Sequence, residues 1–235
     1  MRLGTAATYA GSPKKPADLR QLLDDIKLIW RGLDKDLKSD ITSDGGLVAE
    51  IGGTLGAIRV LFVSCSPADQ EALRVSGELR AIRESLKLGE NGNKVIVEDL
   101  PAATIDDLRR ALLINAYDIV HFSGHANKDV LVFETADSKA ISVPLTAIGD
   151  LIRRHQEINC VILNGCESAL ELNVPLCAYT VGMVDSIADD AAIEFSRGFY
   201  DALSAGKDIG FAIGEGTNAM ELKGFDATSL KILRE

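Results

Sequence analysis

The sequence predicts an α/β protein in which helices cover both faces of a mostly parallel sheet, giving three layers. From residue 58 onward, short apolar runs alternate with longer amphipathic stretches. Several of the apolar runs lack polar alternation, which is typical of strands buried on both faces of a parallel sheet. The chain has 235 residues, of which 46% are hydrophobic, so it is long enough to bury a full core.

Residues 1–57 are predicted to form an N-terminal tail, an amphipathic helix and a flexible connector, and residues 58–235 the α/β domain. After Pro16, apolar residues recur at alternating spacings of four and three. This stripe consists of Leu19, Leu23, Ile26, Trp30, Leu33 and Leu37. The spacing favours one helix over residues 17–38 with an apolar face. That face could dock on the globular domain or bind another molecule, and the pattern leaves both possibilities open.

The domain's elements follow from the period of the apolar residues. Short runs rich in β-branched residues are expected to be strands, and they cover residues 58–64, 94–98, 117–122, 160–164 and 179–183. Amphipathic stretches are expected to be helices, and they cover residues 69–88, 105–115, 145–155, 189–205 and 209–222. Residues 130–133 and 140–143 could form a small hairpin.

Composition argues against several classes of protein. The net charge of −10 disfavours direct binding to nucleic acid, and no apolar run approaches the roughly 20 residues that cross a bilayer. The first residues lack the pattern of a secretory signal, and the four cysteines form no disulfide or metal pattern. We therefore expect a cytoplasmic protein. No phosphate-binding glycine loop follows the first strand, so we expect no nucleotide or other cofactor. The sequence also has no aspartate-rich loop of the kind that binds calcium.

Two reactive side chains follow two of the predicted strands. His125 comes just after the third strand and Cys166 just after the fourth, each next to a glycine. In open α/β sheets, sites form at the carboxyl ends of strands. If these strands are neighbours, His125 and Cys166 face each other there. A single cysteine or histidine is more often a buried or satisfied residue, so the prediction rests on the pair.

The pair suits nucleophilic catalysis. A thiol attacks a carbonyl well only as the thiolate, and an imidazole can take its proton and later protonate the leaving amine. Backbone N–H groups near the nucleophile can stabilise the developing oxyanion. The amides of Cys166 and Ala126 are the candidate donors. The pattern does not indicate a metal site, because no ligand partner stands at matching spacing.

At these residues the sequence resembles the CHAT domain family, caspase-like cysteine peptidases related to caspases and separases. The resemblance runs from about residue 58 to the C-terminus. It rests on IRVLFVSCSP (58–67) followed by ELRAI (78–82), on HFSGHA (121–126), on LNGCES (163–168) and on the segment 181–206. It implies a caspase-like sandwich in which His125 is the general base and acid and Cys166 the nucleophile. One departure is Ala126, where many relatives have glycine.

The resemblance also bears on specificity and role. Related metacaspases carry aspartate two places before the cysteine, where this chain has Asn164. Asn164, Asp185 and Asp189 are candidates for the S1 pocket, but Asp189 stands where a helix N-cap is expected, and its position favours that role. The family implies an endopeptidase acting on a protein substrate, as an effector of bacterial antiviral defence controlled by a sensor protein. That partner is expected to bind through the N-terminal helix. The alternative is a catalytically silent scaffold that binds proteins.

Overall fold

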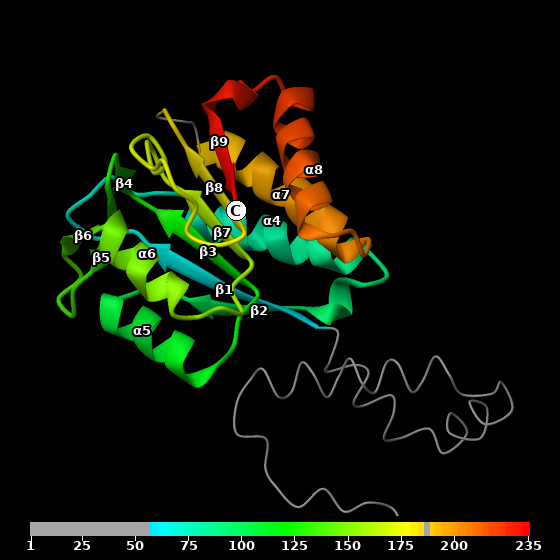
Figure 1. Ribbon diagram of the computed structural model, residues 1–235. Coiled ribbons are helices and arrows are strands. Elements are labelled where there is room, and N and C mark those ends of the chain that lie inside the picture. The colour runs from blue at the N-terminus through cyan, green and yellow to red at the C-terminus, as the bar shows by residue number, and fades with distance from the viewer. Residues whose placement is uncertain (1–56, 186–188) are drawn as a thin grey trace, which may run out of the picture. The chain divides into compact units, whose positions relative to one another are not determined.

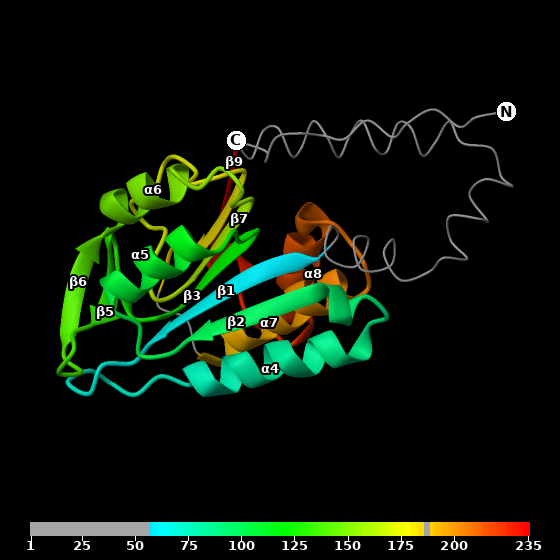
Figure 2. The same cartoon turned by 90° about the horizontal axis from the view of Figure 1, so that it is seen from below.

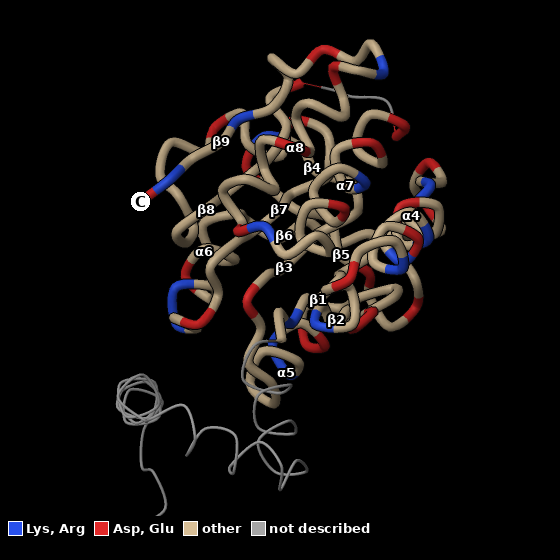
Figure 3. The backbone as a smooth tube through the Cα atoms, turned by 90° about the vertical axis from the view of Figure 1, so that its right-hand side faces the viewer, with Lys and Arg blue, Asp and Glu red and all other residues tan. Residues whose placement is uncertain are grey.

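The computed structural model describes residues 57–185 and 189–235. The helix expected over residues 17–38 lies outside this part of the chain. Within the described residues, none of the helices combines the length and apolar character needed to span a bilayer. Acidic and basic residues are interspersed over the described elements (Figure 3).

Six strands form the main sheet in the order β2-β1-β3-β7-β8-β9 (Figure 1). They are β1 (Ile58–Cys65), β2 (Val95–Leu100), β3 (Ile119–Gly124), β7 (Cys160–Asn164), β8 (Tyr179–Met183) and β9 (Leu230–Arg234). The first five pair in parallel, whereas β9 is antiparallel to β8. The carboxyl ends of β1, β3 and β7 therefore lie side by side at one edge of the sheet.

Helices cover both faces of this sheet (Figures 1 and 2). On one face are α4 (Val75–Leu88), α7 (Asp189–Ser204) and α8 (Ile209–Leu222), and on the other α5 (Ile105–Ile114) and α6 (Leu145–Arg153). Alternate residues of each central strand enter two separate cores, so Phe62 packs with α4 and α7 while Leu61 packs with α5 and α6. This arrangement confirms the predicted three-layer fold.

A small antiparallel sheet follows His125 directly. It consists of β4 (Ala126–Asn127), β5 (Val130–Glu134) and β6 (Ala140–Pro144). The hairpin of β5 and β6 agrees with the pattern expected there. Two short 3-10 helices, η1 (Gly92–Lys94) and η2 (Ala227–Ser229), complete the described elements.

One predicted helix is shorter in the structure, and β4, β9, η1 and η2 were not predicted. Helix α4 begins at Val75 and not at residue 69, because hydrogen bonds within residues 66–74 and to β6 hold this stretch as a loop. The Asp69 carboxylate accepts a hydrogen bond from the Ala140 amide (2.9 Å), and the Ser66 hydroxyl accepts one from the Leu73 amide (3.3 Å). Strand β9 was not predicted, because an edge strand needs no continuous apolar run.

Candidate active site

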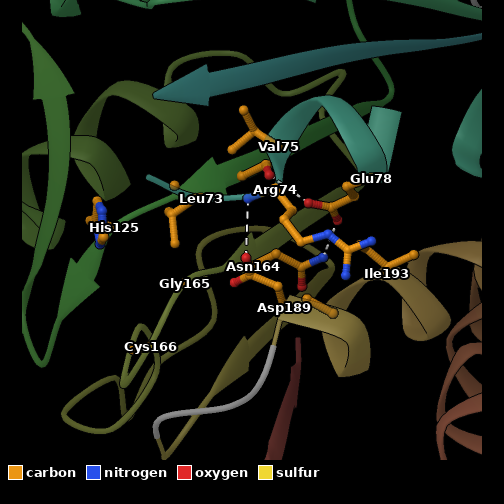
Figure 4. Close-up of a pocket in the computed structure, with 13 residues that line it drawn as sticks. Leu73, Arg74, Val75, Glu78, His125, Asn164, Gly165, Cys166, Asp189 and Ile193 are labelled. Carbon is orange, nitrogen blue, oxygen red and sulfur yellow. Dashed lines mark hydrogen bonds between the residues drawn. The ribbon is translucent and has the colours of Figure 1, made fainter. Parts of the chain in front are cut away.

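The two strands that lead to His125 and Cys166 are neighbours in the sheet. β3 and β7 pair in parallel, with Ser123 opposite Asn164. His125 and Cys166 lie two residues beyond this pair, and both line one hollow at the end of the sheet (Figure 4). The two residues therefore line the same hollow, and their pairing as a catalytic dyad stays a prediction.

Cys166 lies in a tight turn. The Ser168 amide donates to the carbonyl of Gly165 (3.2 Å), which closes a four-residue turn around Cys166 and Glu167. Glu167 has φ of 55°, a left-handed conformation that is uncommon for a residue with a side chain. The buried Ser168 hydroxyl donates to the Leu163 carbonyl (2.7 Å) and accepts from the Met183 amide (3.0 Å). The turn is thus tied to both β7 and β8.

Glycine at position 165 lets the two strand ends approach each other. A Cβ atom there would lie 2.6 Å from the Gly124 carbonyl oxygen and 2.9 Å from the Ala126 Cβ. Both distances are shorter than van der Waals contact. The segments that carry His125 and Cys166 are therefore as close as their backbones allow.

The His125 ring is oriented by a backbone carbonyl. Its Nε2 lies 2.7 Å from the Glu71 carbonyl oxygen. Because a carbonyl oxygen only accepts, Nε2 carries the proton of this hydrogen bond and Nδ1 is the nitrogen left to act as a base. The His125 carbonyl in turn accepts from the Val132 amide (2.9 Å), which anchors the backbone to β5.

Sequence reasoning missed the role of Glu71. The amphipathic pattern placed this residue inside a helix, where its carbonyl would be engaged within the helix. In the structure it belongs to the loop between β1 and α4. Every residue type offers a carbonyl, so the sequence carries no signal for this contact.

Beneath the hollow lies a buried polar cluster, here called the Glu78 cluster. It consists of Glu78, His121, Ser123, Asn164, Ser196 and Tyr200, which are at most 6% exposed. The Glu78 carboxylate accepts from Ser123 Oγ (2.5 Å) and from Asn164 Nδ2 (2.5 Å). It also accepts from Ser196 Oγ (2.6 Å) and His121 Nε2 (3.0 Å). Figure 4 shows Glu78 and Asn164 pointing toward each other.

The cluster holds Glu78 as a carboxylate. Burial alone would raise the pKa of this carboxyl, but the His121 ring and the hydroxyls of Ser123 and Ser196 hold the pKa below its usual value. The Tyr200 hydroxyl lies 3.0 Å from His121 Nδ1, and burial raises the pKa of this phenol well above its ordinary value. The sequence offers one signal for the cluster, an acid among the apolar residues of an amphipathic helix.

The candidate S1 residues separate in the structure. Asn164 and Asp189 line the hollow with His125 and Cys166, whereas Asp185 is exposed and is not part of that lining. The Asp189 carboxylate accepts from the Arg74 amide (3.1 Å) and so caps the start of α4. The Asn164 Oδ1 atom is buried and has no hydrogen-bond partner among the described residues.

The other three cysteines are buried. Burial raises the pKa of Cys65 to about 12 and that of Cys177 to about 11, and it raises the pKa of Cys160 well above its ordinary value. Cys166 differs from them because it is partly exposed. Within residues 57–185 and 189–235, groups of three or more potential metal ligands are absent.

Known proteins resemble both the sequence and the fold. The family model described as the CHAT domain matches residues 31–175, more than half of the chain. A Roc-COR-CHAT protease from an unknown prokaryotic organism is 25% identical over 176 residues, which are 70% of this chain and 17% of that protein. The chain therefore spans only a small part of this curated relative.

Two solved structures are similar in fold. A secreted C11 cysteine protease from Bacteroides thetaiotaomicron, solved with an irreversible peptide inhibitor, has a TM-score of 0.54 at 11% identity. The match covers 76% of this chain and 66% of that one. The Arg-specific cysteine proteinase gingipain R has a TM-score of 0.50 at 11% identity, covering 78% of this chain and 47% of that one. These likenesses indicate a caspase-like fold.

Proposed function

Because the chain belongs to the CHAT domain family, we propose that it is a cysteine endopeptidase that hydrolyses a peptide bond of a protein substrate. Cys166 is the nucleophile and His125 the general base. The observation that carries this proposal is the placement of both residues beyond the paired ends of β3 and β7, in the lining of one hollow.

In the proposed reaction, Nδ1 of His125 takes the thiol proton of Cys166, and the thiolate attacks the carbonyl carbon of the substrate. The tetrahedral intermediate collapses when the imidazolium gives this proton to the leaving amine. Water then hydrolyses the thioester with His125 again as base. The hydrogen bond from Nε2 to the Glu71 carbonyl supports this assignment, because it keeps the proton on Nε2 and so leaves the basic lone pair on Nδ1.

We assign the oxyanion site to the amides of Cys166 and Ala126. Cys166 follows Gly165, whose missing side chain permits the approach of the Ala126 segment. Two amides from adjacent strand ends can then point at one oxygen, and each such donor is worth on the order of 10²–10³ in kcat.

The P1 side chain of the substrate enters the hollow beside Asn164 and Asp189. The supporting observation is the buried Asn164 Oδ1, which is an acceptor without a partner among the described residues. The orientation of the Asn164 amide is set by Glu78, because the carboxylate can only accept and the NH₂ group must therefore point toward it. A P1 side chain that donates hydrogen bonds would satisfy this atom, and the Asp189 carboxylate favours a positive charge.

The direct test is labelling with a peptide acyloxymethyl-ketone library, read out by mass spectrometry of Cys166. We expect labelling of Cys166 that is lost in His125→Ala, with a preference for P1 Lys, Arg or Gln over Asp or Leu. An equal rate in the wild type and His125→Ala would reject the peptidase proposal and favour a protein-binding scaffold. A preference for acidic or aliphatic P1 would reject only the proposed pocket.

We further propose that a partner protein controls the enzyme, as an effector of bacterial defence. An unregulated peptidase would endanger its own cell. The chain also spans only 17% of a relative named for Roc and COR parts besides its CHAT part, so that relative carries other segments on the same polypeptide. The apolar stripe over residues 17–38 is the segment proposed to bind the partner.

Deletion of residues 1–46 tests partner control separately from chemistry. Co-purification from the native host, followed by mass spectrometry, identifies partners of the full chain. We expect the deletion to lose such a partner and to change the rate of Cys166 labelling in its presence. If neither binding nor rate changes, the proposed role of the N-terminal segment is wrong, whereas the peptidase proposal stands.

A further inference from the structure

The Glu78 carboxylate connects the two strands that carry the reactive residues. Glu78 belongs to α4, Ser123 to β3 and Asn164 to β7. Ser123 lies two residues before His125, and Asn164 two residues before Cys166. We propose that Glu78 is a positioning residue, which fixes the distance between His125 and Cys166 by holding Ser123 and Asn164. This inference rests on the proposed peptidase function.

Each oxygen of the Glu78 carboxylate binds a side chain from a different strand. Oε2 accepts from Ser123 Oγ at 2.5 Å, and Oε1 accepts from Asn164 Nδ2 at 2.5 Å. Hydrogen bonds to a charged acceptor are short and strong, roughly twice as strong as neutral ones. A carboxylate is rigid, so the separation of its two oxygens sets the separation of the two donors. The side-chain bridge thereby supplements the backbone pairing of β3 and β7.

Two further donors keep the bridge in place. Ser196 Oγ, from α7, and His121 Nε2, from β3, both donate to Oε1 at 2.6 and 3.0 Å. Glu78 is 3% exposed, so competition from water is small. A carboxylate held by four donors has little freedom to rotate. Its position relative to β3 and β7 is therefore well defined.

The bridge lies close enough to the reactive residues for small errors to matter. Only two residues separate each held side chain from His125 or Cys166, and the backbones are in close contact at Gly165. Displacement of a reactive group by about 1 Å can lower a rate on the order of 10²-fold. Glu78 itself lines the hollow behind the reactive pair.

The test is a double-mutant cycle on the reactivity of Cys166. Four full-length proteins are compared: wild type, Glu78→Ala, His125→Ala and the double variant. Iodoacetamide is the probe because it needs no substrate pocket, and mass spectrometry gives the second-order alkylation rate of Cys166. If Glu78 acts through the His125–Cys166 distance, its removal has no further effect once His125 is gone.

We expect each single variant to lower the alkylation rate on the order of 10-fold to 100-fold. The double variant should react no more slowly than His125→Ala. Multiplicative effects, or a wild-type rate in Glu78→Ala, would overturn the inference. If the wild type and His125→Ala react equally fast, the peptidase proposal itself fails, and the two failures are thus distinguishable.

Two more variants separate positioning from folding. Glu78→Gln can still accept from Asn164, and the Ser123 hydroxyl can turn to accept from the new amide, so this variant should recover the rate to within a few-fold of wild type. Where Glu78→Ala does not fold, Ser123→Ala replaces it in the cycle, because it removes one donor and leaves Glu78 with three. A wild-type rate in Ser123→Ala then contradicts the inference.

The matched control is Ser85→Ala. Ser85 is a buried hydroxyl on the same helix, and its Oγ donates to the Arg197 carbonyl at 3.2 Å, away from the strand ends. This change should lower stability without changing the alkylation rate of the folded protein. An equal loss of rate in Ser85→Ala would mean that any loosening of α4 slows the reaction, and the specific role of Glu78 would be rejected.

Discussion

At the scale of single residues, burial decides which cysteine can react. Cys65, Cys160 and Cys177 are buried, and burial raises the pKa of each, so almost none of their thiolate exists at neutral pH. Iodoacetamide should therefore alkylate Cys166 in the native protein and leave the other three unmodified. Peptide mass mapping measures this, and the same reagent in guanidinium chloride should modify all four. Native labelling of Cys65 at the rate of Cys166 would contradict the described packing.

The lowered pKa of Glu78 predicts a pH dependence of stability. Because its folded-state pKa lies below the unfolded value of about 4.3, the unfolded chain binds the proton more readily. The stabilisation is complete above the unfolded pKa and is lost as the pH falls through the folded pKa. Thermal unfolding of the wild type and Glu78→Gln between about pH 3 and 7 tests this. The wild type should lose its advantage toward acid pH, and a difference that does not vary with pH would contradict the assignment.

The sequence predicted residues that stand beside local signals and missed those defined by distant contacts. His125 and Cys166 each follow an apolar run and lie next to a glycine, so the sequence predicted their position at the carboxyl ends of two strands. Glu78 binds Ser123 and Asn164, which are 45 and 86 residues away. No local pattern pairs such positions, and an acid in an amphipathic helix ordinarily faces solvent.

At the scale of elements, the close approach at Gly165 predicts the effect of a single methyl group. Gly165→Ala would place a Cβ within 2.6 Å of the Gly124 carbonyl oxygen, so the two strand ends must separate. We expect a loss of activity on the order of 10-fold or more through misplacement of Cys166. Overpacking should also destabilise the protein by about 1–3 kcal/mol.

The measurement for Gly165→Ala is kcat and KM on the peptide chosen by the library, together with thermal unfolding. The matched control is Gly214→Ala in α8, where an added Cβ meets nothing within 4 Å. This control should retain activity and gain slight helix stability. Full activity in Gly165→Ala would show that the two segments tolerate separation.

Periodicity predicted most elements because the central strands are buried on both faces and the helices on one. The periodicity of apolar residues failed to predict segments whose structure does not depend on burying one face. Residues 69–74 resemble the start of a helix, but Asp69 binds the backbone of β6 and the loop continues to Val75. Among the described strands β9 pairs with β8 alone, and its five residues include Lys231 and Arg234, so no apolar run marks it.

At the scale of the whole molecule, one sheet supports two cores. Strands β1, β3 and β7 send alternate residues into the core under α5 and α6 and the core under α4, α7 and α8. Loss of either core would therefore expose one face of strands that the other core needs. We expect the described residues to unfold in a single cooperative transition, because the two cores share the same strands.

A pair of substitutions, one in each core, tests this coupling. Ile148 in α6 and Ile213 in α8 are 1% and 0% exposed. Ile148→Ala and Ile213→Ala should each destabilise by about 2–5 kcal/mol, which lowers Tm by about 4–20 °C. Both should shift the same transition in differential scanning calorimetry.

The control for this pair is Leu222→Ala at the end of α8, where the side chain is 77% exposed. Loss of an exposed leucine removes little buried area, so Tm should change by no more than about 2 °C. If Ile148→Ala split the transition into two while Ile213→Ala did not, the layer of α5 and α6 would unfold separately. The strands that precede His125 and Cys166 belong to both cores, so a single transition would mean that β3 and β7 lose the packing on their two faces together.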